Sequence, residues 1–265
     1  MKNDVRVNLY DPVMDSHAQR RRAARHAPSA VPGSARKAPI TVERITDAAL
    51  AIVSERGYDA LTMRSVAAAL ETGPASLYAH VVNKADLDEL IIGRLCGEIA
   101  LPDPTPAQWR EQLIDVCGQL RDQYLKYPGI SRAALAMDVT DLDVLRVNEG
   151  MLAILIAGGI APQAAAWVID ALFLYVGAYA MDIAVADAGS ESGGHRLGEH
   201  GRAELIERFA ALPADRFPNT GRYAAELTSG TGHQRFDFTL DLILASLASA
   251  SAGAISRSHQ GEPSG

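Results

Sequence analysis

The chain has 265 residues, of which 48% are hydrophobic and 22% charged, with a formal net charge of −7 and 2 cysteines. These values exclude collagen-like, disulfide-stapled and wholly disordered proteins. Because Ala and Leu dominate the apolar residues while β-branched and aromatic residues are sparse, the composition favours an all-α fold.

Residues 1 to 37 form a basic arm in front of an acidic body. The arm holds eight basic and three acidic residues, a net charge of +5, which leaves −12 for the rest of the chain. Proline, serine and glycine interrupt it, so we expect the arm to be disordered when free. It lacks the apolar run of a secretory signal, which indicates a cytoplasmic protein. The arm either binds a polyanion such as nucleic acid or is a solvated tail without a partner.

Three short helices are predicted after the arm. The first follows the N-cap Thr41 and ends at Gly57, and the second is capped by Thr62 and lasts about two turns. Pro74 suits the first position of a third, still shorter helix. Apolar residues recur at helical spacing in all three, at Ile45, Ala48, Ala49, Ile52, Val53, Met63, Val66, Ala67, Leu70, Leu77 and Val81.

Two brief helices joined by a tight turn are typical of a helix-turn-helix, whose second helix enters the major groove of DNA. The stretch from Leu61 to Leu87, LTMRSVAAALETGPASLYAHVVNKADL, closely resembles the recognition module of TetR-family transcriptional regulators. The resemblance covers residues 40 to 101, and its pattern positions are Thr62, Val66, Ala67, Leu70, Leu77, Tyr78, His80 and Lys84. It implies a three-helix DNA-binding module followed by a helical ligand-binding and dimerisation domain.

The resemblance also implies roles for single residues. Arg64 matches a position that reaches a guanine edge in some members, or otherwise a phosphate. Tyr78 and His80 match residues that touch the DNA backbone, although the Tyr78 ring also suits core packing and His80 a hydrogen bond inside the module. Thr62 is expected to reach a phosphate from the start of the second helix. Lys84 resembles the family's phosphate-binding lysine.

Two departures from the family pattern affect DNA recognition. Glu71 stands where glycine is common, so either Glu71 adopts an unusual backbone or Thr72 and Gly73 make the reversal. The third helix offers DNA only small side chains beside Tyr78, which favours methyl contacts and shape over base hydrogen bonds. These small residues are Pro74, Ala75, Ser76 and Ala79.

The module itself is acidic. Residues 38 to 101 contain five basic and nine acidic residues, a net charge of −4, so the module needs cations from elsewhere to bind DNA. We therefore expect arginines of the arm to enter an adjacent minor groove. They are Arg20, Arg21, Arg22 and Arg25.

The remaining chain is predicted to form a helical body. Asn83 is expected to cap a fourth helix that links the module to the body, and three prolines at 102, 104 and 106 mark the boundary. Helices are predicted at 107–127, at a short segment through Ala136, and at 141–157, 162–186 and 236–250, with a polar loop near 188–201. The expected domains are the module at 38–101, the effector and dimerisation domain at 102–251, and a flexible tail at 252–265.

The long helix from Pro162 is apolar nearly all round, as expected if it buries one face in its own subunit and another in a partner. With the final helix it would build a homodimer that places two recognition helices one turn apart on a palindromic operator. Asp170 and Asp182 of this helix either orient an effector or face solvent or the dimer seam.

Large side chains of the body either line an effector cavity or pack in the core. They are Trp109, Tyr124, Met137, Met151, Trp167, Phe173, Tyr175 and Tyr179. The apolar stretch 151–186 is interrupted by polar residues, so no membrane span is expected. Cys96 and Cys117 have no metal or redox spacing and indicate buried thiols in a reducing compartment.

No catalytic motif, cofactor site or metal site is predicted, and His195, Glu199 and His200 lack a firm ligand spacing. The sequence therefore supports a homodimeric TetR-like regulator, a repressor that releases its operator when a small-molecule effector binds. Two alternatives are an architectural DNA-binding protein without an effector and an all-helical enzyme that kept a vestigial module. A ligand-shaped cavity argues against the first, and failure to bind DNA from its own promoter would favour the second.

Overall fold

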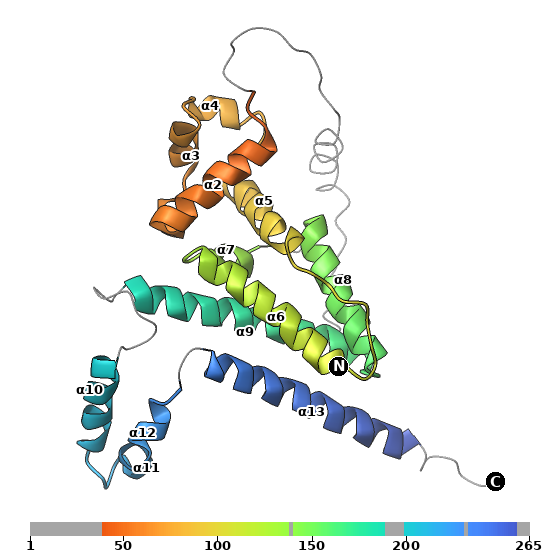
Figure 1. The fold of residues 1–265 in the computed structure, drawn as a ribbon, viewed down its shortest axis with the longest axis vertical. Coiled ribbons are helices and arrows are strands. Elements are labelled where there is room, and N and C mark those ends of the chain that lie inside the picture. The colour runs from red at the N-terminus through yellow and green to blue at the C-terminus, as the bar shows by residue number, and fades with distance from the viewer. Residues whose placement is uncertain (1–38, 138–139, 189–198, 231–232, 259–265) are drawn as a thin grey trace, which may run out of the picture.

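The computed structural model describes residues 39–137, 140–188, 199–230 and 233–258. All regular secondary structure within these ranges is helical, which confirms the predicted fold class (Figure 1). The basic arm lies outside the described residues. The described residues form a small helical module, a linking helix and a larger helical body.

The module begins with α2 (Val42–Arg56), followed by the 3-10 turn η1 (Tyr58–Ala60), α3 (Met63–Ala69) and α4 (Pro74–Leu77). The predicted caps are confirmed. The side chain of Thr41 accepts a hydrogen bond from the backbone N–H of Arg44, and Gly57 ends α2 with a φ of 76°. Thr62 caps α3 in a capping box with Ser65, in which each side chain bonds the other residue's backbone N–H.

Glu71 makes the reversal between α3 and α4. Its φ is 50°, in the left-handed region that non-glycine residues rarely adopt, while Gly73 is extended. The Thr72 N–H donates to the carbonyl of Ala67 at 2.9 Å and the Glu71 N–H to that of Ala68 at 3.0 Å, so the turn closes α3 with the bonds of a helix C-terminus. Of the two alternatives that the sequence left open, the strained residue is therefore Glu71.

The linking helix α5 (Lys84–Gly97) runs from the module to the body, and the side chain of Asn83 caps it by accepting from the Asp86 N–H. The body contains α6 (Trp109–Lys126), α7 (Ser131–Leu135), α8 (Leu142–Ala157) and α9 (Pro162–Ala188). In Figure 1, α6 lies along α9 and α8 stands against the lower end of α5. One continuous hydrophobic core extends from α2 of the module to α13 of the body.

Tight contacts fix α8 to α5. A Cβ atom on Gly93 of α5 would lie 2.6 Å from the carboxylate of Asp141, which caps α8. The guanidinium of Arg146 on α8 donates to the carbonyls of Cys96 at 2.7 Å and Ile99 at 3.0 Å. It thereby satisfies carbonyls that the end of α5 leaves without helical partners. These contacts hold α8 and α5 closely together.

Three short helices follow α9 that the sequence analysis did not predict: α10 (Glu199–Ala210), α11 (Pro218–Arg222) and α12 (Ala224–Leu227). They pack on one another beside the body (Figure 1). The last helix, α13 (Gln234–Ser258), is longer than predicted and includes part of the segment expected as a flexible tail from residue 252. Phe236, Leu240 and Leu244, spaced four residues apart, bury one face of α13.

Helix α9 meets the length and composition of a membrane span between Pro162 and Val185, although the sequence analysis expected no such segment. Of its most apolar stretch, 44% is buried inside the protein. It packs against α6, α7 and α8 in the body.

Candidate functional site

The outer face of α4 is open to solvent. Tyr78 is 51% exposed, while Leu77 between the exposed positions is fully buried and anchors the helix to the module. The small residues predicted to face DNA are all exposed, at Pro74, Ala75, Ser76 and Ala79. In Figure 1, α3 and α4 lie at the end of the molecule away from the body. The predicted recognition surface is therefore accessible to a large partner.

The other module residues singled out in the sequence have different surroundings. Arg64 is exposed on α3. Thr62 is exposed, but its hydroxyl oxygen accepts from the Ser65 N–H at 2.9 Å as part of the helix cap. His80 is partly buried, and its backbone N–H donates to the Leu77 carbonyl at 2.8 Å.

Lys84 is held by neighbouring side chains. Its ammonium forms an ion pair with Asp88 and donates to the hydroxyl of Tyr58 at 2.9 Å. The same ammonium lies 4.1 Å from the centroid of the Tyr58 ring. The predicted phosphate contact of Lys84 therefore requires the ammonium to leave or share these partners.

The arginines expected to help the module bind DNA lie outside the described residues. They are Arg20, Arg21, Arg22 and Arg25. Their contribution stays a prediction.

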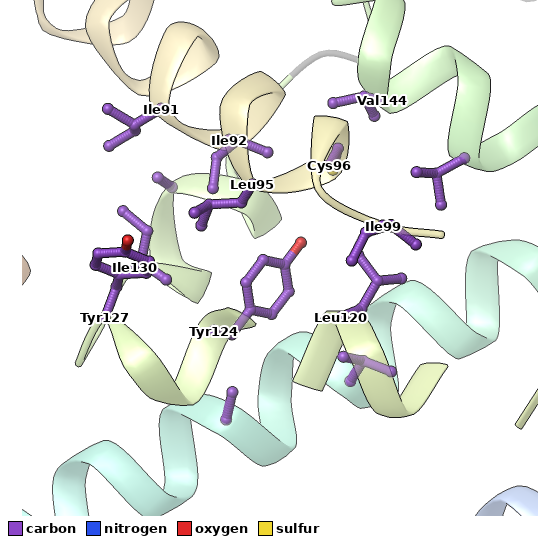
Figure 2. Close-up of a cluster of buried hydrophobic side chains, with 14 of the residues drawn as sticks. Ile91, Ile92, Leu95, Cys96, Ile99, Leu120, Tyr124, Tyr127, Ile130 and Val144 are labelled. Atoms are coloured by element: carbon purple, nitrogen blue, oxygen red, sulfur yellow. The ribbon is translucent and has the colours of Figure 1, made fainter. Parts of the chain in front are cut away.

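The body contains a cavity of about 260 Å³ between five helices. Three of the large side chains singled out in the sequence line it, namely Tyr124 of α6, Met137 after α7, and Phe173 of α9. Figure 2 shows the ring of Tyr124 standing on α6 with its hydroxyl toward the end of α5. Burial raises the pKa of Tyr124, so this hydroxyl stays protonated at neutral pH and keeps a proton to donate.

The other large residues lie elsewhere. Trp109 packs on Gly158, where a Cβ atom would lie 2.5 Å from its ring, and Met151 is buried in the core. Trp167 is 70% exposed on α9. Tyr175 and Tyr179 of α9 pack around Phe236 of α13, with their ring centroids 5.5 and 4.9 Å from that of Phe236. These contacts join the two helices. None of these five side chains belongs to the wall of this cavity.

Further wall residues were not found from the sequence. Ile92 and Cys96, four residues apart on α5, line the cavity together with Asn148 of α8 and Leu135 of α7. The helical spacing of these residues indicated burial, but nothing in the sequence shows which buried positions border a void. Asp170, for which the sequence left open a role in orienting an effector or a place facing solvent or the dimer seam, is both exposed and part of the lining, so it stands at the edge of the cavity. The remaining lining residues are Ala134, Val144, Ala166, Ile169 and Leu174.

The cysteine in the cavity wall is unreactive. Burial raises the pKa of the Cys96 thiol to about 12, so it stays protonated at neutral pH and is a poor nucleophile. Cys117 is also buried, as predicted. Within the described residues no group of three His, Cys, Asp or Glu side chains is placed to hold a metal ion, and His195 lies outside those residues.

Two family models match the chain. The model for "Bacterial regulatory proteins, tetR family" matches residues 45–89, which contain α3, α4 and the start of α5. The model for "Tetracyclin repressor-like, C-terminal domain" matches residues 101–250, which contain the cavity-bearing body from α6 onward.

Solved structures and named transcriptional regulators are similar to this chain. The apo structure of ActR from Streptomyces coelicolor is 33% identical, with a TM-score of 0.73 over 82% of this chain and 99% of that chain. ActR in complex with actinorhodin has a TM-score of 0.72 at 33% identity, covering 80% of this chain and 97% of that one. An HTH-type transcriptional regulator of Saccharopolyspora erythraea is 28% identical over 81% of this chain and 86% of its own length. The HTH-type transcriptional repressor DrrR1 of Streptomyces coeruleorubidus is 25% identical, over 80% and 79%.

Proposed function

Because the chain belongs to the TetR family of bacterial transcriptional regulators, we propose that it is a cytoplasmic homodimeric repressor that releases its operator when a small molecule fills the body cavity. The observation that carries this proposal is the pairing of an exposed recognition face on α4 with a cavity that α5 reaches from the module. The name of the relative DrrR1 supports repression over activation. The cavity favours an effector-responsive regulator over an architectural protein without a ligand.

The DNA-binding surface combines a short recognition helix with flanking groups. Tyr78 and the small residues around α4 are exposed, and Arg64 on α3 is exposed as well. A guanidinium suits a guanine edge because its forked donors match O6 and N7, whereas Tyr78 has one hydroxyl that suits a phosphate. Specificity would then rest on Arg64, methyl contacts and DNA shape.

The dimer surface is formed by α9 and α13. Each helix buries one face in the subunit, yet each also exposes large apolar side chains. These are Trp167, Leu174 and Val185 on α9, and Phe238 and Leu242 on α13. An apolar surface of this kind on a soluble protein is typical of a subunit interface. A second copy of the chain would cover it and bring two α4 helices to one operator.

The effector is proposed to resemble the ligands of ActR. The structures of that relative include complexes with actinorhodin and (S)-DNPA, and its sequence identity to this chain is 32–33%. The cavity here has mostly apolar walls, an aromatic side chain at Phe173, and a neutral hydroxyl donor at Tyr124. These features suit an apolar ring system that carries an oxygen acceptor facing Tyr124.

Effector and operator are linked through α5. Ile92 and Cys96 near its end border the cavity, and Lys84 begins the same helix next to α4. A ligand that displaces the wall moves a rigid helix whose other end carries the DNA-binding module. Because binding linkage is reciprocal, operator DNA must weaken effector binding by the same factor that the effector weakens DNA binding.

The first test is DNA binding by single variants, measured between about 50 and 200 mM salt on the DNA that flanks the gene. We expect Lys84→Ala to lower affinity on every sequence and to reduce the salt slope by about one. Arg64→Ala should relax the choice at one base pair at a cost of about 1–3 kcal/mol. Tyr78→Ala should also weaken binding on every sequence, because its hydroxyl faces the backbone rather than a base.

The control is Arg208→Ala, which removes an exposed cation on α10 at the other end of the molecule. It should leave both the affinity and the salt slope unchanged. Equal losses for Arg64→Ala on specific and random DNA would contradict its assignment to base recognition. A wild-type protein that does not distinguish the flanking DNA from random DNA would contradict the regulator itself.

The second test concerns the effector cavity, with actinorhodin as the probe in a calorimetric titration. We expect Tyr124→Phe to weaken binding about twofold to twelvefold, because one hydrogen bond contributes about 0.5–1.5 kcal/mol. Tyr127→Phe is the matched control, since Tyr127 is a buried tyrosine close to Tyr124 that does not line the cavity. Equal losses in both variants, or no binding of actinorhodin by the wild type, would refute the proposed ligand class.

A further inference from the structure

The ammonium of Lys84 is engaged on three sides by its own module. It forms an ion pair with the carboxylate of Asp88, one helical turn later on α5. It also donates a hydrogen bond to the hydroxyl oxygen of Tyr58 at 2.9 Å, and it lies over the Tyr58 ring. The Tyr58 hydroxyl in turn donates to the second oxygen of Asp88 at 2.8 Å. The Lys84 and Asp88 side chains are 34% and 14% exposed, so water only partly screens this cluster.

Asp88 opposes a phosphate contact by Lys84. A DNA phosphate that approaches the ammonium also approaches the carboxylate, and the two anions repel each other. Burial and the neighbouring Asp88 raise the pKa of Tyr58, so its hydroxyl remains a donor that keeps Asp88 in place. Lys84 therefore binds a phosphate more strongly when it is separated from Asp88 than in the arrangement seen here.

Tyr58 also contacts the body. Its backbone N–H donates to the carbonyl of Pro128 at 2.9 Å, in the corner between α6 and α7. The guanidinium of Arg132 on α7 lies 5.3 Å from the centroid of the Tyr58 ring and pairs with Asp59. A Cβ atom on Gly129 would lie 3.3 Å from the Cβ of Tyr58, which shows how closely the corner approaches η1.

The same short helix reaches the cavity. Ala134 and Leu135 of α7 line the effector cavity, two and three residues after Arg132. At the start of α7, the buried hydroxyl of Ser131 has no hydrogen-bond partner within the part of the chain that the structure describes. Because an unsatisfied buried hydroxyl costs about 1–3 kcal/mol, a different placement of α7 that satisfies it would be favoured by that contact.

We propose that Tyr58 and Asp88 form a latch that withholds Lys84 from DNA phosphates, and that α7 sets the latch according to the state of the effector cavity. Tyr58 is a positioning residue in this scheme, because it acts on DNA only through Lys84. The inference rests on the proposed DNA-binding function, and it adds a second route beside α5 between the cavity and the operator surface.

The latch is tested by DNA binding of Asp88→Asn on the DNA flanking the gene. We expect a rise in affinity of about threefold to tenfold at low salt, since the carboxylate that competes with phosphate is removed. Asp47→Asn is the matched control, because it removes the same charge from an exposed ion pair with Arg94 near the other end of α5. This control should leave affinity within about twofold.

A background without Lys84 separates the latch from a general charge effect. In Lys84→Ala protein, Asp88→Asn should raise DNA affinity by no more than the roughly twofold general charge effect allowed for the Asp47→Asn control. An equal rise in both backgrounds, or a fall in affinity on Asp88→Asn in wild-type protein, would overturn the latch. Tyr58→Phe keeps the ring packed against the core and removes only the hydroxyl. It should therefore also raise DNA affinity, which tests the latch independently if Asp88→Asn perturbs folding.

The connection to the body is tested by a double-mutant cycle between Arg132→Gln and Asp88→Asn. Arg132→Gln should raise DNA affinity about threefold alone and add nothing once Asp88 is replaced. Arg110→Gln, which removes a cation stacked on Trp109, is the control and should have no effect. Additive effects, or none from Arg132→Gln, would overturn the role of α7. If the wild-type protein does not bind DNA specifically, the proposed function itself is refuted.

Discussion

Leu77→Ala should abolish specific DNA binding by destabilising the recognition helix. Leu77 is fully buried and is the residue of α4 that anchors it to the module core. Truncating its side chain to alanine is expected to cost about 2–5 kcal/mol, because the Cγ methine and both methyl groups leave a packed environment. A helix of four residues has little stability of its own and depends on this packing.

The measurement is the free energy of unfolding in denaturant together with binding to the DNA flanking the gene. Val82→Ala is the control, because Val82 lies five residues later in the same segment and is 49% exposed. It should change stability by no more than about 0.5 kcal/mol. Specific binding that survives Leu77→Ala at wild-type strength would show that α4 is not the recognition element.

Phe238→Asp should convert the protein to a monomer and lower operator affinity by at least about a hundredfold. Phe238 is 68% exposed on α13, whereas Phe236, two residues earlier, is fully buried against α9. A charge within the proposed apolar interface of α9 and α13 would remain unpaired when the second copy binds. A monomer offers one recognition helix and loses the gain in affinity from joining two.

Sedimentation of the purified protein gives the subunit state, and DNA binding gives the functional result. Leu142→Asp is the matched control, since Leu142 is 69% exposed at the start of α8 and places the same charge on a different face. Subunit folding should be unaffected in both variants because neither side chain lies in the core. A dimeric Phe238→Asp protein would place the subunit interface elsewhere.

The sequence predicted the module well because its helix boundaries are local. Thr41, Thr62 and Asn83 each cap a helix through their own side chains, and Gly57 ends one with a positive φ, so three or four neighbouring residues decide each boundary. Helices α11 and α12 were missed because they have only five and four residues, and both pack mainly on α10 and on each other. Helix α10 was missed although it has 12 residues, because the segment before it was predicted to be a polar loop.

The cavity was predicted only in part. Side-chain size indicated Tyr124, Met137 and Phe173, but also residues such as Met151 that fill the core completely. A cavity is the space that several helices leave unfilled, so its walls depend on helix packing rather than on residue type. The environment of Lys84 shows the same limit. Asp88, at i+4, was readable as a partner, whereas Tyr58 reaches Lys84 only through the fold.

The central claim is that two α4 helices of one dimer occupy successive major grooves of an operator. Hydroxyl-radical footprinting of wild-type protein on the DNA flanking the gene tests it most directly. We predict two protected half-sites related by a two-fold axis, with centres about 10 base pairs or a multiple of that apart on one face of the duplex. A single protected patch, or protection that is lost equally to random competitor DNA, would contradict it.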